Sequence, residues 1–367
     1  YWLVRLSSNG SVMSQHCFGG YNNDQATAME QTADGGYIFA GWTTSNDGDV
    51  SGNHGGADWW IVKINGISDI TWQKCYGGSS HDYAQSIWQT TDGGYIVAGY
   101  TYSNDGDVVG IHETTKGDFW VVKLNAAGGL VWQRCLGGTK EDWAYSAIQT
   151  ADGCYVIAGK TTSNNGDVFG HHNPNNYDCW VVKLDANGGL IWQKCLGGNN
   201  DDEAKSLWPT SDGGFILGGS TNSTDGDVSG QHYPNYSDMW VAKLNSTCGL
   251  EWQRCLGGTY PDAAQSIQQT TDGGYIVAGF TMSNDGDVTG NHSILVKDFW
   301  IVKLTPTGVM EWQKCCGGTS TDSANSIRQD ADGGYIVGGF TRSNDGDVSS
   351  HHNPDSDDFW VVKLRPM

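Results

Sequence analysis

The chain is short of several residue types, and each shortage narrows what it can be. It has 367 residues but only 7 Pro, 6 Glu and 20 Lys plus Arg. It also lacks any run of 18 or more apolar residues, so we expect no membrane insertion. With 41 acidic residues the net charge is -21, which repels phosphate backbones and anionic surfaces. We therefore do not expect nucleic acid as a partner.

The residues that are abundant follow a repeat. Six tryptophans recur at intervals of 60 residues, and Trp2 lies 58 residues before the first of them. A repeat this long indicates units that cannot bury their apolar faces alone and must stack on their neighbours. The six tryptophans are Trp60, Trp120, Trp180, Trp240, Trp300 and Trp360.

Each unit carries four strand-like segments, which in the second unit are residues 82–90, 95–101, 119–124 and 130–136. They are rich in aromatic and β-branched residues at a period of two, and Gly-containing turns separate them, so a helical interpretation fails. Four antiparallel strands per 60 residues are typical of one β-propeller blade. An open β-solenoid is the alternative, but its coils are usually shorter. The predicted fold is all-β, a six-bladed β-propeller.

No linker interrupts the repeat, so we predict a single domain over residues 1–367. Residues 1–23 would supply N-terminal closing strands. The repeat units are predicted at residues 24–81, 82–141, 142–201, 202–261, 262–321 and 322–367.

The order of these segments resembles the Kelch layout, and more closely the SBBP-type β-propeller repeats of secreted bacterial proteins. The shared signatures are DFWVVKL at residues 118–124, WQRCLGG at 132–138 and YIVAGYTYSND at 95–105. This resemblance implies a propeller fold and an exported protein, such as the large surface proteins of Bacteroidetes-like bacteria associated with type IX secretion. It implies no catalytic residues. The DGDVxGxH part of the long loop has no role in that pattern.

The chain contains seven segments of the third type but six of each other type, so one terminal strand is spare. Strands within 324–364 could close a blade with residues 12–18, which would leave Trp2, Leu3, Val4 and Leu6 unpaired. An unpaired apolar strand can add to another molecule, so strand exchange into fibres is one hypothesis. The alternatives are that the chain is a piece of a longer array, or that the strand caps an edge.

The long loop of each unit is a candidate calcium site. It contains an Asn-Asp-Gly-Asp-like tetrapeptide, then a His, then an Asp before the third strand, and closely spaced carboxylates are typical Ca²⁺ ligands. Six bound divalent ions would cancel 12 of the 21 negative charges. The candidate ligands are Asp47, Asp49, Asp58, Asp105, Asp107, Asp118, Asp167, Asp178, Asp225, Asp227, Asp238, Asp285, Asp287, Asp298, Asp345, Asp347 and Asp358.

Structural roles compete with the calcium hypothesis. Asp and Asn side chains commonly accept hydrogen bonds from loop backbone, and no unit has the complete twelve-residue calcium loop with its final Glu. Asn165 makes the third loop the weakest candidate. The loop His residues are too widely spaced for a zinc site, so we expect each to bond a loop Asp.

Most cysteines recur in the fourth strand, where we expect buried, unpaired thiols. Cys179 is different: if Leu184 pairs with Leu190 across the turn, Cys179 lies opposite Cys195 and a disulfide is possible. The recurring lysines near the end of the third strand, such as Lys123, should face solvent or a neighbouring Asp. The recurring Asp at the start of each unit, such as Asp82, should stabilise the turn between blades.

We find no departure from the repeat that indicates catalysis, so an enzyme is not expected. The non-recurring Trp42, Trp88, Trp143 and Trp208 could contact sugars, whereas the recurring tryptophans should pack between blades. The favoured function is a secreted structural or adhesive module, stabilised by calcium, that self-associates or binds a cell-surface or matrix partner. A carbohydrate-binding lectin is the alternative, and a glycan-active enzyme is third.

Overall fold

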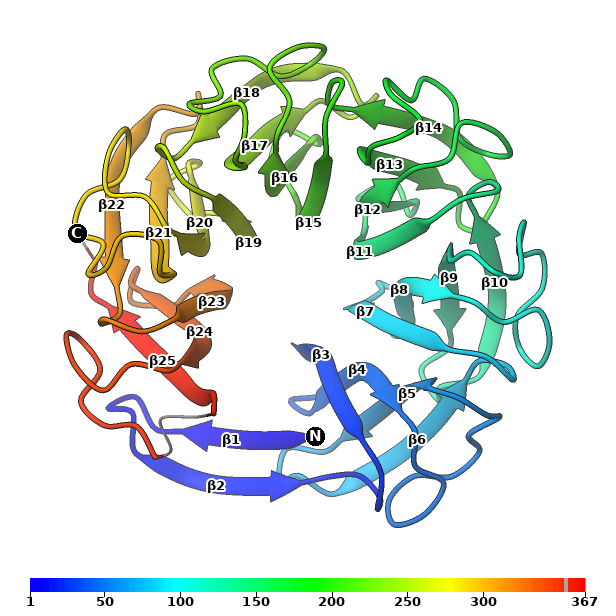
Figure 1. Ribbon diagram of the computed structural model, residues 1–367. Coiled ribbons are helices and arrows are strands. Elements are labelled where there is room, and N and C mark those ends of the chain that lie inside the picture. The colour runs from blue at the N-terminus through cyan, green and yellow to red at the C-terminus, as the bar shows by residue number, and fades with distance from the viewer. Residues whose placement is uncertain (353–355, 367) are drawn as a thin grey trace. The chain divides into compact units, whose positions relative to one another are not determined.

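The computed structural model describes residues 1–352 and 356–366, which contain strands, turns and irregular segments (Figure 1). In this part of the chain, 25 strands are present and no helix is long and apolar enough to cross a membrane. Every strand pair with a defined register is antiparallel, for example β7 with β8 and β8 with β9. The prediction of an all-β, blade-like repeat is confirmed.

The chain divides into two compact units, Tyr1–Phe169 with Val181–Gln193, and Gly170–Trp180 with Lys194–Met367. The boundary falls within β13 and β14, inside the predicted repeat unit of residues 142–201. The first unit contains two complete blades. The first blade is β3 (Asp24–Gln31), β4 (Tyr37–Thr43), β5 (Asp58–Ile64) and β6 (Ile70–Tyr76), and the second is β7 (Asp82–Gln89), β8 (Tyr95–Thr101), β9 (Asp118–Leu124) and β10 (Leu130–Leu136).

The third blade is the one that the boundary divides. It has the order β11 (Asp142–Gln149), β12 (Tyr155–Thr161), β13 (Asp178–Leu184) and β14 (Leu190–Leu196).

The second unit contains two further four-stranded blades and one with three strands. They are β15 (Asp202–Pro209), β16 (Phe215–Thr221), β17 (Asp238–Leu244) and β18 (Leu250–Leu256); then β19 (Asp262–Gln269), β20 (Tyr275–Thr281), β21 (Asp298–Leu304) and β22 (Met310–Cys316); then β23 (Asp322–Gln329), β24 (Tyr335–Thr341) and β25 (Asp358–Leu364).

The N-terminal strands differ from the expectation. β1 (Trp2–Leu6) is not unpaired, because it pairs antiparallel with β2 (Val12–Cys17) in a two-stranded sheet. The two segments are joined by a short turn in which the Gly10 amide bonds the Ser7 carbonyl, so a hairpin forms locally. Residues 12–18 were expected to be the fourth strand of a blade with residues 324–364, but among the described residues β2 pairs with β1, and the sheet of β23, β24 and β25 has three strands.

Large aromatic rings join successive blades within each unit. Trp59 of β5 packs on Trp120 of β9 with ring centroids 4.2 Å apart, and neither side chain is exposed. In the second unit, Phe299 packs in the same way on Trp360, at 4.6 Å. The third strands β5, β9, β13, β17 and β21 are buried at every position, so both of their faces can be apolar, whereas β25 is partly exposed. The recurring tryptophans therefore serve the interior, as predicted.

Each recurring lysine pairs with an Asp, which confirms one of the two expected alternatives, and all except Lys363 are more buried than expected. Lys123 lies in the interior of the second blade and its Nζ is 3.0 Å from Oδ2 of Asp92, in the turn between β7 and β8. The same pair joins Lys63 to Asp34, Lys183 to Asp152, Lys243 to Asp212, Lys303 to Asp272 and Lys363 to Asp332.

All ten cysteines are free, so the predicted bridge between Cys179 and Cys195 is not formed. The prediction assumed unbroken pairing from the turn. In neighbouring blades the register shifts by one residue directly after the turn, which places Cys255 opposite Trp240 and Cys315 opposite Trp300. Such a β-bulge moves each fourth-strand cysteine one position away from the expected partner. The recurring cysteines of β6, β10, β14, β18 and β22 are buried, and Cys17 is exposed.

Candidate functional site

The long loop after the second strand folds onto the Gly-Gly turn that precedes the first strand. In the second blade, Asp105 Oδ1 accepts the Ser79 amide at 2.7 Å, and the Asp107 amide donates to the Gly77 carbonyl at 2.8 Å. The third blade uses Asn165 in place of Asp105, and its Oδ1 accepts the Thr139 amide at 2.9 Å. Because a neutral amide serves equally, this position requires an oxygen acceptor and not a negative charge.

A buried Asp at the start of each blade accepts hydrogen bonds from the preceding turn and from the end of the second strand. Asp82 Oδ2 accepts the Gly78 amide and the Ser103 hydroxyl, each at 2.9 Å, and Oδ1 accepts the Thr101 hydroxyl. The pairing of Asp82 with Thr101, and of Thr101 with Asp118, places these residues in one row across β7, β8 and β9. The prediction that the Asp82 series stabilises the turn between blades is confirmed. The hydrogen bonds that Thr101 and Ser103 donate to Asp82 were not predicted.

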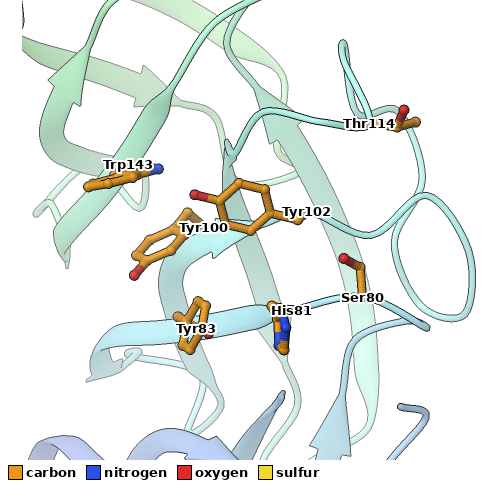
Figure 2. Close-up of a pocket in the computed structure, with 7 residues that line it drawn as sticks. All are labelled: Ser80, His81, Tyr83, Tyr100, Tyr102, Thr114 and Trp143. Carbon is orange, nitrogen blue, oxygen red and sulfur yellow. The ribbon is translucent and has the colours of Figure 1, made fainter. Parts of the chain in front are cut away.

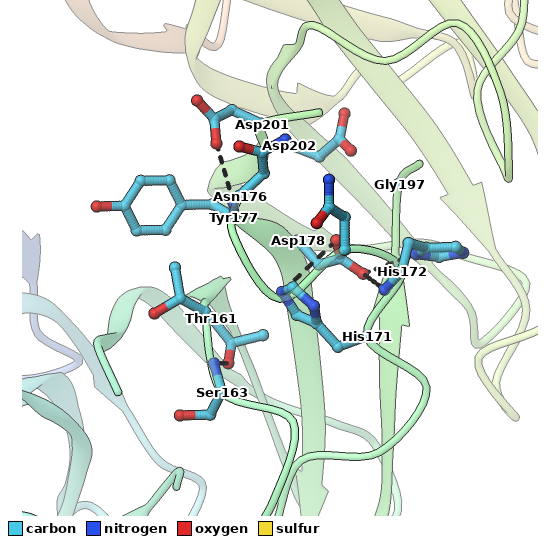
Figure 3. Close-up of polar contacts among 12 residues, drawn as sticks. Thr161, Ser163, His171, His172, Asn176, Tyr177, Asp178, Gly197, Asp201 and Asp202 are labelled. Atoms are coloured by element: carbon cyan, nitrogen blue, oxygen red, sulfur yellow. Dashed lines mark hydrogen bonds and ion pairs between the residues drawn. The ribbon is translucent and has the colours of Figure 1, made fainter. Parts of the chain in front are cut away.

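Each loop histidine bonds the Asp that begins the third strand. His112 Nδ1 lies 2.6 Å from Asp118 Oδ2, and the His112 amide donates to the same oxygen at 3.0 Å. The arrangement recurs at His54, His172, His232, His292 and His352 with Nδ1–Oδ2 distances of 2.6 to 2.7 Å. Figure 3 shows it at His172 and Asp178, with the neighbouring His171. The expected pairing of His with a loop Asp is confirmed.

Carboxylates of successive blades approach each other at the Gly-Gly turn. A Cβ atom on Gly77 would lie 2.5 Å from Asp82 Oδ2 and 2.8 Å from Asp58 Oδ1, so both side chains converge on this glycine. Asp58 Oδ1 and Asp118 Oδ1 are buried and have no hydrogen-bond partner within residues 1–352 and 356–366. Burial raises the pKa of Asp58 to about 6 and that of Asp118 to about 7. These groups hold protons at pH values where exposed Asp is charged.

The candidate calcium ligands are divided among these separate roles. Within residues 1–352 and 356–366, no three His, Cys, Asp or Glu side chains form a group that could hold a metal ion. Asp105 and Asp107 accept hydrogen bonds from backbone amides at the Gly-Gly turn, whereas Asp118 bonds His112. Calcium prefers six to eight convergent oxygens, and this donor set does not fit that requirement.

An open pocket of about 410 Å³ lies beside these loops in the first unit (Figure 2). Aromatic rings from three strands form most of its lining, with Tyr83 on β7, Tyr100 at the end of β8 and Trp143 on β11. Tyr102 follows β8. The polar lining residues are Ser80, His81 and Thr114.

The rings form one continuous aromatic surface. Tyr100 stacks on Trp143 with centroids 5.1 Å apart and an interplanar angle of 24°, and Tyr83 lies 5.2 Å from Tyr100. Trp42 extends the surface through an edge contact with Tyr83 at 5.8 Å. The structure thus brings together two of the four tryptophans predicted to contact sugars, Trp42 and Trp143. It adds three tyrosines that sequence analysis missed.

A signal for these tyrosines was present in the repeat. Residues equivalent to Tyr100 and Tyr102 are rarely both aromatic, and only the second unit has two tyrosines there. The residues at the position of Tyr100 in the other units are Trp42, Lys160, Ser220, Phe280 and Phe340, and those at the position of Tyr102 are Thr44, Thr162, Asn222, Met282 and Arg342.

Comparison with solved structures concerns the fold. The chain is similar to the WD40 domain of Pan2 from Neurospora crassa, with a TM-score of 0.51 and 11% identity over 93% of this chain and 79% of that one. It is also similar to hydrazine synthase from Kuenenia stuttgartiensis, with a TM-score of 0.51 and 11% identity over 97% and 90%. The fold is a six-bladed β-propeller. Identity this low carries no function from these proteins.

Comparison with known sequences is more limited. No family model matches the chain. The regulatory protein FlaEY of Caulobacter vibrioides is 24% identical over 253 residues, which are 64% of this chain. The chain spans about a quarter of that relative, 26% of its length.

Proposed function

We propose that this propeller is a non-enzymatic adhesive module of an exported protein. The observation that carries the proposal is that its recurring charged side chains serve the fold. Asp82 fastens the turn between blades, His112 and Asp118 bond each other, and Lys123 pairs with Asp92. A scaffold with such internal bonds presents loops and rings for binding without requiring a catalytic group.

Support for export comes from the sequence. The signatures shared with SBBP-type repeats run through the whole chain, and the strongly negative charge favours solubility and discourages self-adsorption to anionic surfaces. A cell-surface or matrix partner fits a surface of this kind. The test is attachment of the purified chain to surface-immobilised cell-wall and matrix preparations, with a polysaccharide hydrolysis panel run beside it. Saturable attachment without hydrolysis is expected, and release of sugars would contradict the non-enzymatic assignment.

Self-association is the second part of the proposal, and exposed strands support it. Trp2 of β1 is 60% exposed and Phe359 of β25 is 59% exposed, whereas Phe119 and Phe299 at the position of Phe359 are fully buried. Apolar strands with an unpaired edge can add a strand from another molecule. Light scattering and electron micrographs of the purified chain test this, with Val4→Lys as the variant that should weaken association. A strictly monomeric wild-type chain would end the idea.

A further inference from the structure

The aromatic pocket departs from a repeat that is otherwise devoted to structure. Its rings are half-buried and lie on the loop side of the blades, and their combination is not reproduced in another unit, although single rings such as Phe280 occur at equivalent positions. Buried packing does not require them, because Ser220 and Asn222 occupy the positions of Tyr100 and Tyr102 two units later. An exposed cluster of rings with polar groups around it is typical of a binding site.

From this geometry we infer that the pocket formed by Tyr83, Tyr100, Tyr102 and Trp143 binds a neutral carbohydrate ring. The inference deepens the proposed adhesive function by naming its ligand class. A sugar ring has an apolar face of C–H groups, which can lie on an aromatic ring, and an edge of hydroxyls that need hydrogen-bond partners.

Polar groups that suit such an edge are present. The hydroxyls of Tyr83 and Tyr100 have no hydrogen-bond partner in the described residues, and Ser80 and Thr114 also line the pocket. His81 Nδ1 accepts the Ala57 amide at 3.1 Å, so the neutral imidazole carries its proton on Nε2 and can donate from there. These are uncharged donors and acceptors. They match hydroxyl groups better than they match a phosphate or a carboxylate.

A cationic ligand fits less well. Aromatic cages for quaternary ammonium groups need several ring faces directed at one point. Here Tyr100 and Trp143 stack on each other, and the Lys160 ammonium lies 4.7 Å from the centroid of the Trp143 ring. The Lys160 ammonium would repel a second cation at this ring, whereas it would not repel a neutral sugar.

The nearby carboxylate is also engaged. Glu141 Oε2 accepts the Trp143 indole at 3.0 Å, the Gly117 amide at 3.1 Å and the Tyr102 hydroxyl at 3.2 Å. Its Oε1 lies 3.5 Å from Lys116 Nζ. This carboxylate positions two rings of the pocket and is already paired. The overall charge of -21 further disfavours anionic sugars and nucleotides.

The first experiment is a glycan array carrying neutral glucans, mannans, galactans and xylans beside sialylated and sulfated glycans. The strongest neutral oligosaccharide is then titrated by calorimetry, with tetramethylammonium and AMP as competing probes. We expect selective binding of a neutral glycan. Absence of neutral glycan binding, or binding of tetramethylammonium or AMP alone, would overturn the inference.

The second experiment places the ligand in the pocket. Tyr100→Ala removes the central ring and should weaken binding about 3- to 10-fold, as the energy of one aromatic contact implies. Phe280→Ala is the matched control, because it removes a ring from the equivalent strand position three units later, outside the pocket. Tyr83→Phe retains the ring and tests the hydroxyl alone. Melting curves establish that each variant is folded.

The outcomes separate the inference from the proposed function. If Tyr100→Ala binds glycan as tightly as Phe280→Ala, the pocket assignment is wrong, even where surface attachment persists. If the wild type hydrolyses the glycan that it binds in the pocket, the assignment stands and the non-enzymatic function fails.

Discussion

His112 Nδ1 lies 2.6 Å from Asp118 Oδ2, and this contact gives a hydrogen-bond partner to a carboxyl group that is buried at the end of the long loop. Asp118 has no exposed surface, and its Oδ2 receives both the ring and the amide of the same histidine. The pair is therefore a structural clamp, repeated once per blade.

Removal of the ring should be costly. We expect His112→Ala to lower the free energy of unfolding by about 1–3 kcal/mol, because a buried carboxylate oxygen loses its principal donor. His112→Asn should recover most of the loss, since its amide can donate from nearly the same place. Urea denaturation of both variants measures the difference, and equal stability of His112→Ala and wild type would disprove the clamp.

Stability should fall as the pH rises from about 4 to 8. Burial raises the pKa of Asp58, Asp142 and Asp118 to about 6, 6 and 7, so the folded chain retains protons that the unfolded chain releases near pH 4. Burial lowers the pKa of His232, but the hydrogen bond and charge of Asp238 outweigh it, so this pKa is also raised. A raised His pKa likewise makes stability fall as the pH rises. Calorimetric melting temperatures across this range test the slope.

The variant Asp118→Asn provides the control for that slope. It imitates the protonated acid, retains an oxygen for His112, and places an NH₂ group where Oδ1 has no partner. Its melting temperature should change less with pH than that of the wild type. A wild-type melting temperature that rises between pH 5 and 8 would contradict the prediction.

The pair of Lys123 and Asp92 should respond unequally to loss of each partner. The Lys123 side chain is 4% exposed and that of Asp92 is 62% exposed. Asp92→Asn leaves a buried ammonium without its counter-ion, whereas Lys123→Met retains the apolar stem and leaves a carboxylate that water can reach. We expect Asp92→Asn to cost more, by about 1 kcal/mol or more, at neutral pH. Chemical denaturation measures it, and the reverse order would contradict the burial argument.

The same pairs limit stability in acid. Burial alone would raise the pKa of Asp92, but hydrogen bonds from Thr90, Gly94 and Lys123 outweigh it and hold the pKa at about 2. Stability from this depressed pKa is present above pH 4 and is lost as the pH falls toward 2. Together with the buried carboxyls, this places the expected stability maximum near pH 4 to 5.

Gly106 of the long loop contacts the Gly-Gly turn so closely that a side chain at position 106 should destabilise the fold. Gly106 has φ of +63°, and a Cβ there would overlap the Gly77 carbonyl. Gly106→Ala should destabilise by about 2–4 kcal/mol from backbone strain plus displacement of the turn. Gly110 has φ of +95° with open space around it, so Gly110→Ala carries the strain alone and should cost about 1 kcal/mol. Thermal melting compares the two, and equal costs would show that the turn yields.

Calcium should have little effect on stability. We expect the melting temperature after chelation to remain the same when millimolar calcium is restored, because the candidate ligands bond separate groups and do not converge. Asp105→Asn gives the second loop the acceptor that Asn165 supplies in the third, and it should be neutral. A clear rise in melting temperature with calcium would restore the calcium hypothesis.

Much of this could be predicted from the sequence because it depends on periodicity. Alternation of apolar residues, Gly-containing turns and the 60-residue interval determined the strands, the blades and the pairing of each loop histidine with a nearby Asp such as Asp118. These features are local, and they recur often enough that each unit supports the interpretation of the others.

Other features were decided by tertiary structure. Cys179 and Cys195 are both free, and in a neighbouring blade a bulge after the turn places the equivalent Cys255 opposite Trp240. The N-terminal hairpin paired Trp2–Leu6 with its nearest neighbour in the chain. The convergence of Tyr83, Tyr100 and Trp143 on one pocket depends on the packing of two successive blades. The repeat determines which residues each blade contains, but a one-residue shift in register or a contact between blades depends on the folded backbone, and sequence spacing does not record it.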